Sequence, residues 1–555
     1  MRCKSTHVED TSRPNLVENR LSGEVNVESI LALEERIREH EKTLSKLKRS
    51  RNALLNISAL PPEILGNIFQ CNVTLKYNFG GLEEGSHNFL FVCHHWREVA
   101  LRTPGVWSFW GNTLEDWTRW HRHSGTAPLD LVLDAGCSDD DNDIGGDGPF
   151  DVALHGTLQD RAARDTIRRI HLSSEDTSLL SSIISSLTTV CEGVRSNSVE
   201  SLILSSSDDE PVDISEFFAR YRFPKLQYLR LDSCRITSWD LLTSRTTVLA
   251  TLSLHFHNSS PTPTTSQLLS ILTSNPTLRK LELSGHAIPN DGGGEPPLRV
   301  LLHHLKEVRL DGGLQHVLGL LHRLDHPEKM DRLDITLSEC ASTDIPKTIG
   351  PYLRDHFRRR GRSRDGVGLR VSQFENTVVL YVGDMCGASL PIPGIYDNWF
   401  VSVAVELPQT PGDLLEKRLL DLITHTPRDD VVRFESTCWL RAVEDISARF
   451  PNLRQLHFHT GTISLPTILP KSTAGGEEGV LPSLQRIEFV SRPDGGDWSP
   501  LTAFLTRRAS FGHRLGLLVI LGCHVCPEVA ELIRSAVQEL RHDFIENCPF
   551  GICPE

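Results

Sequence analysis

Two histidine pairs are the first candidates for chemistry in this chain, because alternate residues of a strand point to the same face. His255 and His257 form one pair, and His457 and His459 form the other. Two imidazoles on one face would supply part of a zinc site, but such a site needs three or four protein ligands. No third ligand follows at a typical spacing, so we expect no metal site.

Other motifs for ligands or catalysis are incomplete. Cys523 and Cys526 form a CxxC without the second pair that a zinc ribbon needs. An acidic insertion is similar to a calcium loop, but if Asp139 is its first residue, Ile144 takes the glycine position and Phe150 that of the bidentate glutamate. P-loop, nucleophile-elbow and dinucleotide-binding motifs are absent. We therefore predict a protein that is not an enzyme and holds no cofactor.

Composition narrows the class of protein. The chain has 555 residues, of which 39% are hydrophobic, and a formal net charge of −14. This length predicts several domains or one elongated array. The negative charge argues against general nucleic-acid binding. One basic run is an exception, for which an import signal, a site for an acidic partner and a solvated loop stay open. It comprises Arg358, Arg359, Arg360, Arg362 and Arg364.

Cysteine usage and hydropathy concern the compartment. Thirteen cysteines without a pattern are typical of reduced thiols inside a cell. No apolar run approaches the roughly eighteen residues that span a membrane, and Leu515 to Gly522 is predicted to be a buried strand. The amino-terminal residues lack the apolar core of a secretory signal. We expect a cytoplasmic or nuclear protein that does not bind membranes.

The segment from Ile57 to Trp110 predicts a small helical module. Pro61 and Pro62 fit the first turn of a helix because they lack N–H donors, and Glu63 complements the helix dipole. Pro104 should end a second helix. The apolar stripes of the two helices consist of Ile64, Leu65, Ile68 and Phe69, and of Phe91, Val92, Trp96, Val99 and Ala100. About fifty residues cannot bury all these groups, so some are expected to face a partner.

The ordered motifs LPPEIL, IF, VCHHWR, VA and PGVW in this segment resemble the F-box. The insertion from Cys71 to Asn88 separates its first two helices more widely than in compact members. The resemblance implies that the module binds the Skp-type adaptor of cullin-RING ubiquitin ligases. The adaptor contacts that it implies, some of which also build the core of the module, are Leu60, Pro61, Glu63, Ile64, Leu65, Ile68, Val92, Trp96 and Trp107.

Residues 29–56 have a heptad pattern in front of this module. Charged residues at i, i+4 spacing support one helix of three to four heptads. Two interpretations stay open: a short coiled coil through which the chain self-associates, and an amphipathic helix packed on the F-box. The apolar positions are Ile30, Ile37 and Leu44 in one series and Leu33, Leu47 and Leu54 in the other, with His40 and Arg51 as polar breaks.

Repeats follow the module, with the pattern apolar-x-x-apolar-x-apolar. A proline precedes four copies at a fixed offset, and the last apolar residues of the first seven copies are 23 to 32 residues apart. These features resemble irregular leucine-rich repeats, whose period is about 20 to 29 residues. The copies are IRRIHL, VESLIL, LQYLRL, LATLSL, LRKLEL, LKEVRL, MDRLDI, LRQLHF and LQRIEF, and further strands are predicted at LDLVLD, TVVLYV, FVSVAVEL and VVRFES.

Strand alternation predicts which repeat residues are exposed, because the neighbours of buried residues point to the opposite face. Their mixed charges favour a specific protein partner, the substrate of a ligase, although each of them is also compatible with a solvated strand face. The substrate-binding candidates are Arg230, Asp232, His255, Glu282, Arg309, Asp311, Asp334, His457 and His459, with His171, Ser173, Ser253, Ser284 and Thr336 also expected to be exposed.

Together these patterns predict an α+β or α/β solenoid that resembles fungal F-box proteins with a leucine-rich-repeat-like domain. We expect it to act as the substrate receptor of a Skp-cullin-F-box ubiquitin ligase, and the alternative is a non-catalytic scaffold that works without cullin. The predicted organisation is a disordered tail (1–28), a helix (29–56), the F-box (57–110), the repeat domain (111–540, with an opening helix and strand at 112–134 and an acidic insertion at 135–150) and a second tail (541–555).

Overall fold

The chain divides by its contacts into two units, both seen in the computed structural model. One comprises residues 1–79 and 83–106, and the other comprises 80–82 and 107–555. None of the helices in the described part of the chain combines the length and hydrophobicity of a membrane span. The structure describes residues 27–54, 57, 60–78, 87–110, 122–135, 166–190, 198–207, 210–246, 248–256, 262–289, 299–325, 330–337, 349–354, 356, 367–374, 377–384, 399–406, 431–436, 450–458, 481–490, 498–521, 525 and 527–542.

The first unit is helical. The helix predicted at 29–56 occurs as α1, with nearly the same bounds. The tail predicted at 1–28 lies almost entirely outside the described residues. The elements are α1 (Val27–Ala53), α2 (Pro62–Asn78), the 3₁₀ helix η2 (Asn88–Phe91) and α3 (His94–Leu101), and a further 3₁₀ turn, η3 (Pro104–Trp107), reaches the boundary between the units.

One face of helix α2 supplies buried side chains to the core of this unit. It begins at Pro62, as predicted, and buries Leu65 completely. One turn further, the ring of Phe69 stacks on that of Phe89 with 4.6 Å between centroids and lies 5.2 Å from the ring of Trp96. Aromatic contacts of this kind add to the free energy of apolar burial. They hold α2 against the segment that contains η2 and α3.

The second predicted helix begins later than expected. Cys93 is the extended residue that caps α3, and its Sγ accepts a hydrogen bond from the N–H of Trp96 at 3.5 Å. Phe91 and Val92 therefore lie before the helix, and their placement on its stripe was wrong. Phe91 is the last residue of the 3₁₀ turn η2 and Val92 follows it, because the cap at Cys93 fixes where α3 starts. Helix α3 ends before Pro104, as predicted.

The second unit contains a sheet of 17 strands among the described residues. The strands of this sheet are β1 (Phe109–Trp110), β2 (Leu129–Ala135), β3 (Ile167–Ser174), β4 (Ser201–Ser206), β6 (Tyr228–Asp232), β8 (Thr251–Phe256), β9 (Lys280–Gly285), β11 (Glu307–Gly312), β13 (Arg332–Leu337), β14 (Val367–Phe374), β15 (Thr377–Asp384), β16 (Trp399–Glu406), β17 (Val431–Ser436), β18 (Gln455–Phe458), β19 (Arg486–Val490), β20 (Leu515–Leu521) and β21 (Val537–His542). All thirteen strands predicted from the patterns occur, as does the buried strand predicted at Leu515 to Gly522.

Most neighbouring strands pair in parallel and in constant register. The pairing sets Leu229 beside Leu252, which lies beside Leu281, and all three are fully buried. The same register continues through Val308 to Leu333. A strand of this type cannot bury its apolar row alone, so each row gains its environment from the adjacent strands. The result is a mixed α/β unit around a large, mainly parallel sheet.

The four prolines at a fixed offset start turns in front of strands. Pro224 and Pro276 are each the second residue of such a turn, which the N–H of Leu226 or Leu278 closes by donating to the carbonyl three residues earlier, at 3.2 and 3.1 Å. Pro451 and its counterpart at 482 occupy the same place. Proline suits this position because its φ is already fixed near that of the turn. The pattern thus marks where each strand begins.

One strand runs against the others. The sequence left the boundaries between residues 341 and 450 open, and there β15 pairs antiparallel with both β14 and β16. Strand β16 pairs with β13, and β14 pairs with β17. The order of strands in the sheet here is therefore β13, β16, β15, β14, β17, which differs from their order in the sequence. Strand β14 was not predicted. A regular repeat register is therefore interrupted at this position.

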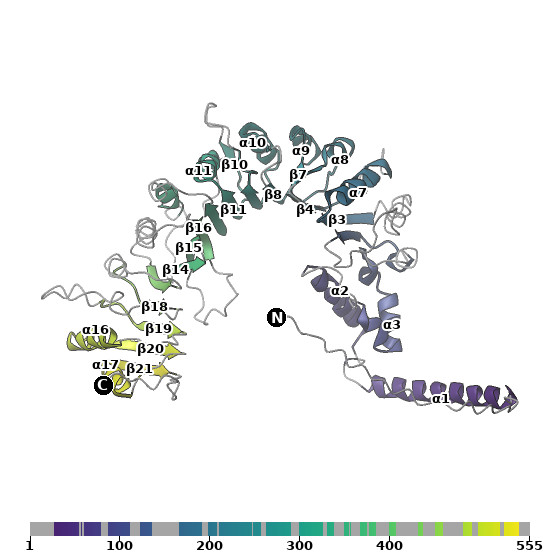
Figure 1. Cartoon of the computed structure of the whole chain (residues 1–555), viewed down its shortest axis with the longest axis horizontal. Helices are drawn as coiled ribbons and strands as arrows, with labels where there is room; N and C mark the ends of the chain where they lie inside the picture. Colours follow the sequence, from purple (N-terminus) through teal and green to yellow (C-terminus); the bar gives the residue numbers. More distant parts are fainter. Residues whose placement is uncertain are drawn as a thin grey trace, which may run out of the picture. The chain divides into compact units, whose positions relative to one another are not determined.

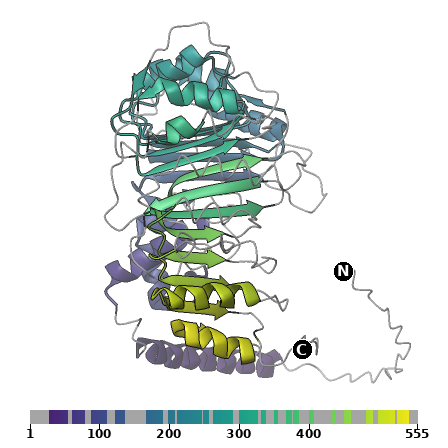
Figure 2. The ribbon, with the colours of Figure 1, turned by 90° about the vertical axis from the view of Figure 1, so that its left-hand side faces the viewer.

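Helices cover one face of the sheet. In Figure 1 the labelled helices of this unit lie along one side of the strands, and Figure 2 shows α16 and α17 across the last strands. Buried apolar residues of the strands and of these helices form one core. The helices are α7 (Thr177–Val190), α8 (Ser215–Arg220), α9 (Asp240–Arg245), α10 (Thr265–Ser274), α11 (Leu314–Arg323), α16 (Ser499–Ser510) and α17 (Pro527–Ala536), and short strands β5 (Val212–Asp213), β7 (Cys234–Arg235), β10 (Val300–Leu301) and β12 (Leu324–Asp325) pair between them.

Candidate functional site

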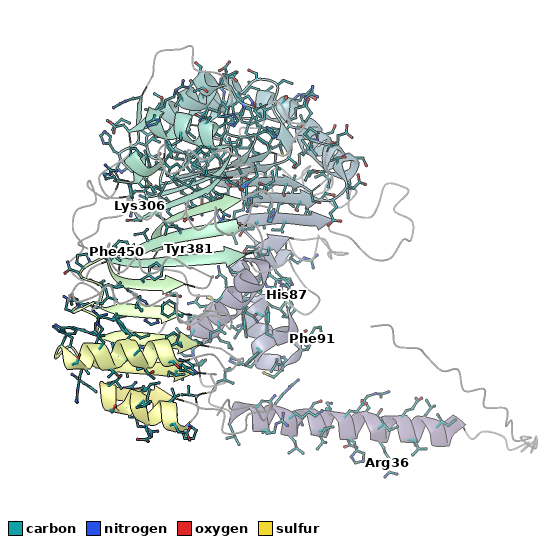
Figure 3. The ribbon with its side chains drawn as sticks, turned by 60° about the vertical axis from the view of Figure 1, so that its left-hand side comes forward. Arg36, His87, Phe91, Lys306, Tyr381 and Phe450 are labelled. Carbon is teal, nitrogen blue, oxygen red and sulfur yellow. The ribbon has the colours of Figure 1, made fainter. Side chains whose placement is uncertain are left out.

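Exposed apolar side chains on the helical unit are one candidate site. Ile64 and Ile68 lie one turn apart on α2 with 47% and 44% of their surface exposed. Phe91, labelled in Figure 3, is 78% exposed, and Val92 beside it is also exposed. Large apolar groups left in water on a small unit are a mark of a protein-binding surface. We call these four residues the apolar surface residues.

The predicted adaptor contacts divide into surface and core. Pro61 and Glu63 are exposed like three of the apolar surface residues, whereas Leu60 is half-buried. Trp96 is half-buried against Phe69. Leu65 and Trp107 are buried, at 0% and 5% exposure, so they are not available to a partner on the surface. From the sequence we expected that some of these residues would build the core, but not which ones, because helical spacing does not say which half of an apolar stripe faces inward.

Phe91 was missing from the predicted adaptor contacts. It lies in the run FLFV, from Asn88 onward, where Phe89 is buried and Phe91 is not. The signal that could have found it is the cap at Cys93, since a helix that starts after this residue cannot carry Phe91 on its inner face. Recognising a cysteine cap from sequence is difficult because serine, threonine and aspartate are the usual caps.

The polar face of the large sheet is the second candidate site. It is the face opposite the buried leucine rows, and it consists of the alternate residues of each strand. Eight of the nine predicted substrate-binding residues lie on it, and His459 lies outside the described residues. In register, its central row runs His171, Ile203, Arg230, Ser253, Glu282, Arg309 and Asp334.

Charges on this face mostly neutralise one another along single strands. A basic residue and an acidic residue two positions away point to the same side, which brings their charged groups into contact. The closest such pairs are Arg230–Asp232 (2.8 Å), Lys280–Glu282 (3.0 Å), Arg332–Asp334 (2.7 Å), Arg433–Glu435 (3.3 Å), Arg486–Glu488 (2.8 Å) and Arg541–Glu539 (2.7 Å). Pairs of this kind offer little net charge to a partner.

Arg309 is the exception. It is exposed and, among the Lys and Arg residues of the polar face whose side chains the structure describes, it alone has neither an ion pair nor a hydrogen bond to a described residue. On the strands of the large sheet the motif Arg-Leu-Asp occurs at 230–232, 309–311 and 332–334. In the copy at 309–311 the ion pair is not formed, because the carboxylate of Asp311 accepts a hydrogen bond from Ser284 Oγ at 3.3 Å instead.

The two acidic neighbours of Arg309 are already engaged. Glu282 and Asp334 lie beside it in register on the adjacent strands. Each of them contacts the basic residue of its own strand, Lys280 or Arg332. The guanidinium of Arg309 is thus free to bind a carboxylate from outside, which arginine does through parallel N–H donors.

A hydrogen-bonded chain lies next to this guanidinium. Ser253 Oγ donates to Glu282 Oε2 at 2.9 Å and lies 2.8 Å from His255 Nε2. Burial lowers the pKa of His255, against the opposing effect of Asp232. Burial disfavours the charged form of Glu282 as well, but hydrogen bonds from Lys280 and Ser253 outweigh it, and the pKa of Glu282 is lowered. Glu282 is therefore charged and His255 mainly neutral at pH 7.

The hydrogen-bonded side chains of Ser253, His255 and Glu282 are not arranged like a serine nucleophile and its base. The hydroxyl proton of Ser253 is directed to a carboxylate, and the side chain is fully buried. A nucleophilic serine gives its proton to a histidine and must be reachable by substrate. The geometry instead fixes the side chains of one part of the polar face.

Three residues predicted to be exposed are buried, and that part of the prediction was wrong. Asp232, Ser253 and His457 have 8%, 0% and 2% of their surface exposed. Strands lie about 4.8 Å apart, so longer side chains on adjacent strands cover a shorter one between them. His457 Nδ1 contacts Glu488 Oε2 at 3.1 Å, and Glu435 is its register partner on the other side.

Several sequence candidates fall outside the described residues. They are His257, His459, Cys523, Cys526, the acidic insertion at 135–150 apart from Ala135, and the five arginines from Arg358 to Arg364. Within the residues that the structure does describe, no group of three His, Cys, Asp or Glu side chains is placed to hold a metal ion.

Comparisons with known proteins give no family. No family model matches the chain, and no curated protein matches it. Among solved structures it is similar to one described as "Crystal structure of Rad7 and Elc1 complex in yeast", with a TM-score of 0.26 and 11% sequence identity. The match covers 93% of this chain and 98% of that chain. A likeness at this TM-score supports no argument about fold or function.

Proposed function

We propose that this chain is the substrate receptor of a Skp-cullin-F-box ubiquitin ligase. The observation that carries the proposal is the division of the motif residues on α2: Leu65 and Phe69 build the core, while Ile64 and Ile68 remain in water. Pro61 and Glu63, which the resemblance to the F-box also assigns to the adaptor, are exposed near them in sequence. A small helical unit that keeps these groups exposed has the surface that docking on an adaptor requires.

The second unit would bind the target. We interpret it as an irregular leucine-rich-repeat-like array, because parallel strands repeat in register with prolines at the same turn. Such arrays present one long surface formed by many strands. Here that surface is polar, and its charges are mixed, which favours a specific protein target. The receptor would act by holding the target's lysines near the conjugating enzyme, which raises their effective concentration.

Copurification tests the function. The intact chain is expected to recover a Skp-type adaptor and a cullin from cells, and a variant lacking residues 57–106 is expected to lose both while keeping its other partners. The deletion stops at 106 because Trp107 belongs to the second unit. If the intact chain recovers neither ligase subunit, the alternative holds and the protein is a scaffold that works without cullin.

Arg309 is expected to matter most among the charged residues of the polar face. Arg309→Glu should lower recovery of the target by about thirtyfold, the effect of losing a side chain worth about 2 kcal/mol of binding free energy. The physical reason is that this guanidinium has no partner within the described polar face, whereas paired arginines are already neutralised. Quantitative mass spectrometry of proteins recovered by the two chains measures the effect.

Lys225→Glu is the matched control for Arg309→Glu. It makes the same change of charge on an exposed residue in the turn before β6, away from the polar face. Its recovered partners should equal those of the unchanged chain. Equal recovery of every partner by both variants would remove Arg309 from the binding surface.

A further inference from the structure

The apolar stripe of α1 is not covered by any of the described residues. Every side chain from Ile30 to Arg51 is exposed, including Ile37 at 57% and Leu47 at 64%. Figure 3 shows the side chains of this helix, Arg36 among them, projecting from it. One of the two interpretations left open by the sequence, a helix packed on the F-box, is therefore not seen among the described residues. Six large apolar residues in water on one helix need another partner.

The residue types on the stripe select the kind of partner. In the first two heptads Ile30 and Ile37 occupy the first position, which Leu44 and Arg51 take in the next two, and Leu33 and Leu47 occupy the fourth position. β-Branched residues at the first position with leucine at the fourth favour two parallel strands of a coiled coil. The helix is 27 residues long, which gives about 40 Å of contact. A second copy of the same helix satisfies both requirements.

Charges beside the stripe agree with the parallel arrangement. Arg36 and Glu41 occupy the flanking positions that meet across a parallel pair in consecutive heptads. Two symmetry-related Arg36–Glu41 contacts would form in each dimer. In the antiparallel arrangement each flanking position faces a position of its own kind, so Arg36 and Glu41 would not meet.

We infer that α1 pairs with α1 of a second copy as a parallel, two-stranded coiled coil. His40 and Arg51 occupy inner positions of the heptad and weaken this pairing, so the dimer dissociates on dilution. The pairing joins two receptors, and a target with two binding segments is then held more tightly than either polar face alone would hold it. It does not depend on the adaptor or on the proposed ligase.

Light scattering after size exclusion tests the dimer with the full chain. We expect twice the mass of one chain at high concentration and a shift towards one chain on dilution. Ile37→Asp combined with Leu44→Asp should give one chain at every concentration. His40→Leu, which replaces a polar layer by an apolar one, should strengthen the dimer by about tenfold or more.

The matched control is Leu31→Asp combined with Ser45→Asp. These exposed residues lie off the stripe, and the control adds the same two charges to the same helix. It should remain dimeric. A single chain at every concentration for the unchanged protein, or a dimer that survives Ile37→Asp with Leu44→Asp, would overturn the inference.

A charge exchange tests the orientation. Arg36→Glu should weaken the dimer by roughly tenfold, because two attractive contacts become repulsive. Adding Glu41→Arg should restore the affinity, since the contacts then form with reversed signs. If Arg36→Glu has no effect, or if the double variant is weaker still, the helices are not parallel and that part of the inference fails.

Discussion

A chain with Ile64→Asp and Ile68→Asp is expected to bind a Skp-type adaptor on the order of a thousandfold more weakly than the unchanged chain. Both side chains are nearly half exposed on one face of α2, while the opposite face is buried through Leu65 and Phe69. Losing two buried isoleucines at an interface costs about 4 kcal/mol, which is a factor near 1,000 in affinity. Titration of the purified chain with adaptor measures this.

The control for this variant adds the same number of negative charges to another face of helix α2. Gln70→Glu with Thr74→Asp adds two carboxylates to α2 at accessible positions that are neither three nor four residues from Ile64 or Ile68 and so do not share their face of the helix. Its affinity should stay within about threefold of the unchanged chain. The assignment of α2 as the docking surface fails if the two variants bind the adaptor equally well.

Phe69→Ala is expected to unfold the helical unit while the sheet stays intact. The side chain is 2% exposed and stacks on Phe89 at 4.6 Å, with Trp96 at 5.2 Å. Removing a buried phenylalanine costs about 3–5 kcal/mol, which matches the whole stability of a unit this small. Hydrogen exchange should become fast in α2 and α3 and remain slow in β6 to β11.

Ile68→Ala is the control for this stability effect. It truncates the neighbouring residue on the exposed side of the same helix, where the cost is about 1 kcal/mol or less. Slow exchange should persist in α2 and α3. Protection of the helical unit that survives Phe69→Ala would show that this stacked cluster does not hold it together.

The sequence by itself determined many of the elements of both units, including most strands of the large sheet. Prolines at 62 and 224 fixed the start of a helix and of a turn because their φ angle and missing donor suit those positions. Period-2 alternation located strands, as at Leu229 and Leu231, because residues two apart share a face. The heptad pattern located α1 to within a few residues. These are local signals, which the sequence carries without the tertiary structure.

Only the tertiary structure decided which of these residues a partner can reach. Leu65 and Ile64 follow one another in one stripe, yet one is core and the other is surface, because the direction of α2 against η2 and α3 sets the inner face. Ser253 and Arg309 both occupy outward positions of strands, yet one is covered and the other is free.

The same holds for the order of the strands and for the pairing of charges. Strand β15 runs antiparallel, which alternation of apolar residues does not encode, because both directions place alternate residues on one face. The three copies of Arg-Leu-Asp on the strands of the large sheet are identical in sequence, but the copy at 309–311 forms no ion pair within itself, since Ser284 on the adjacent strand donates a hydrogen bond to the carboxylate of Asp311. Contacts across strands depend on register, and register exists only once the sheet has formed.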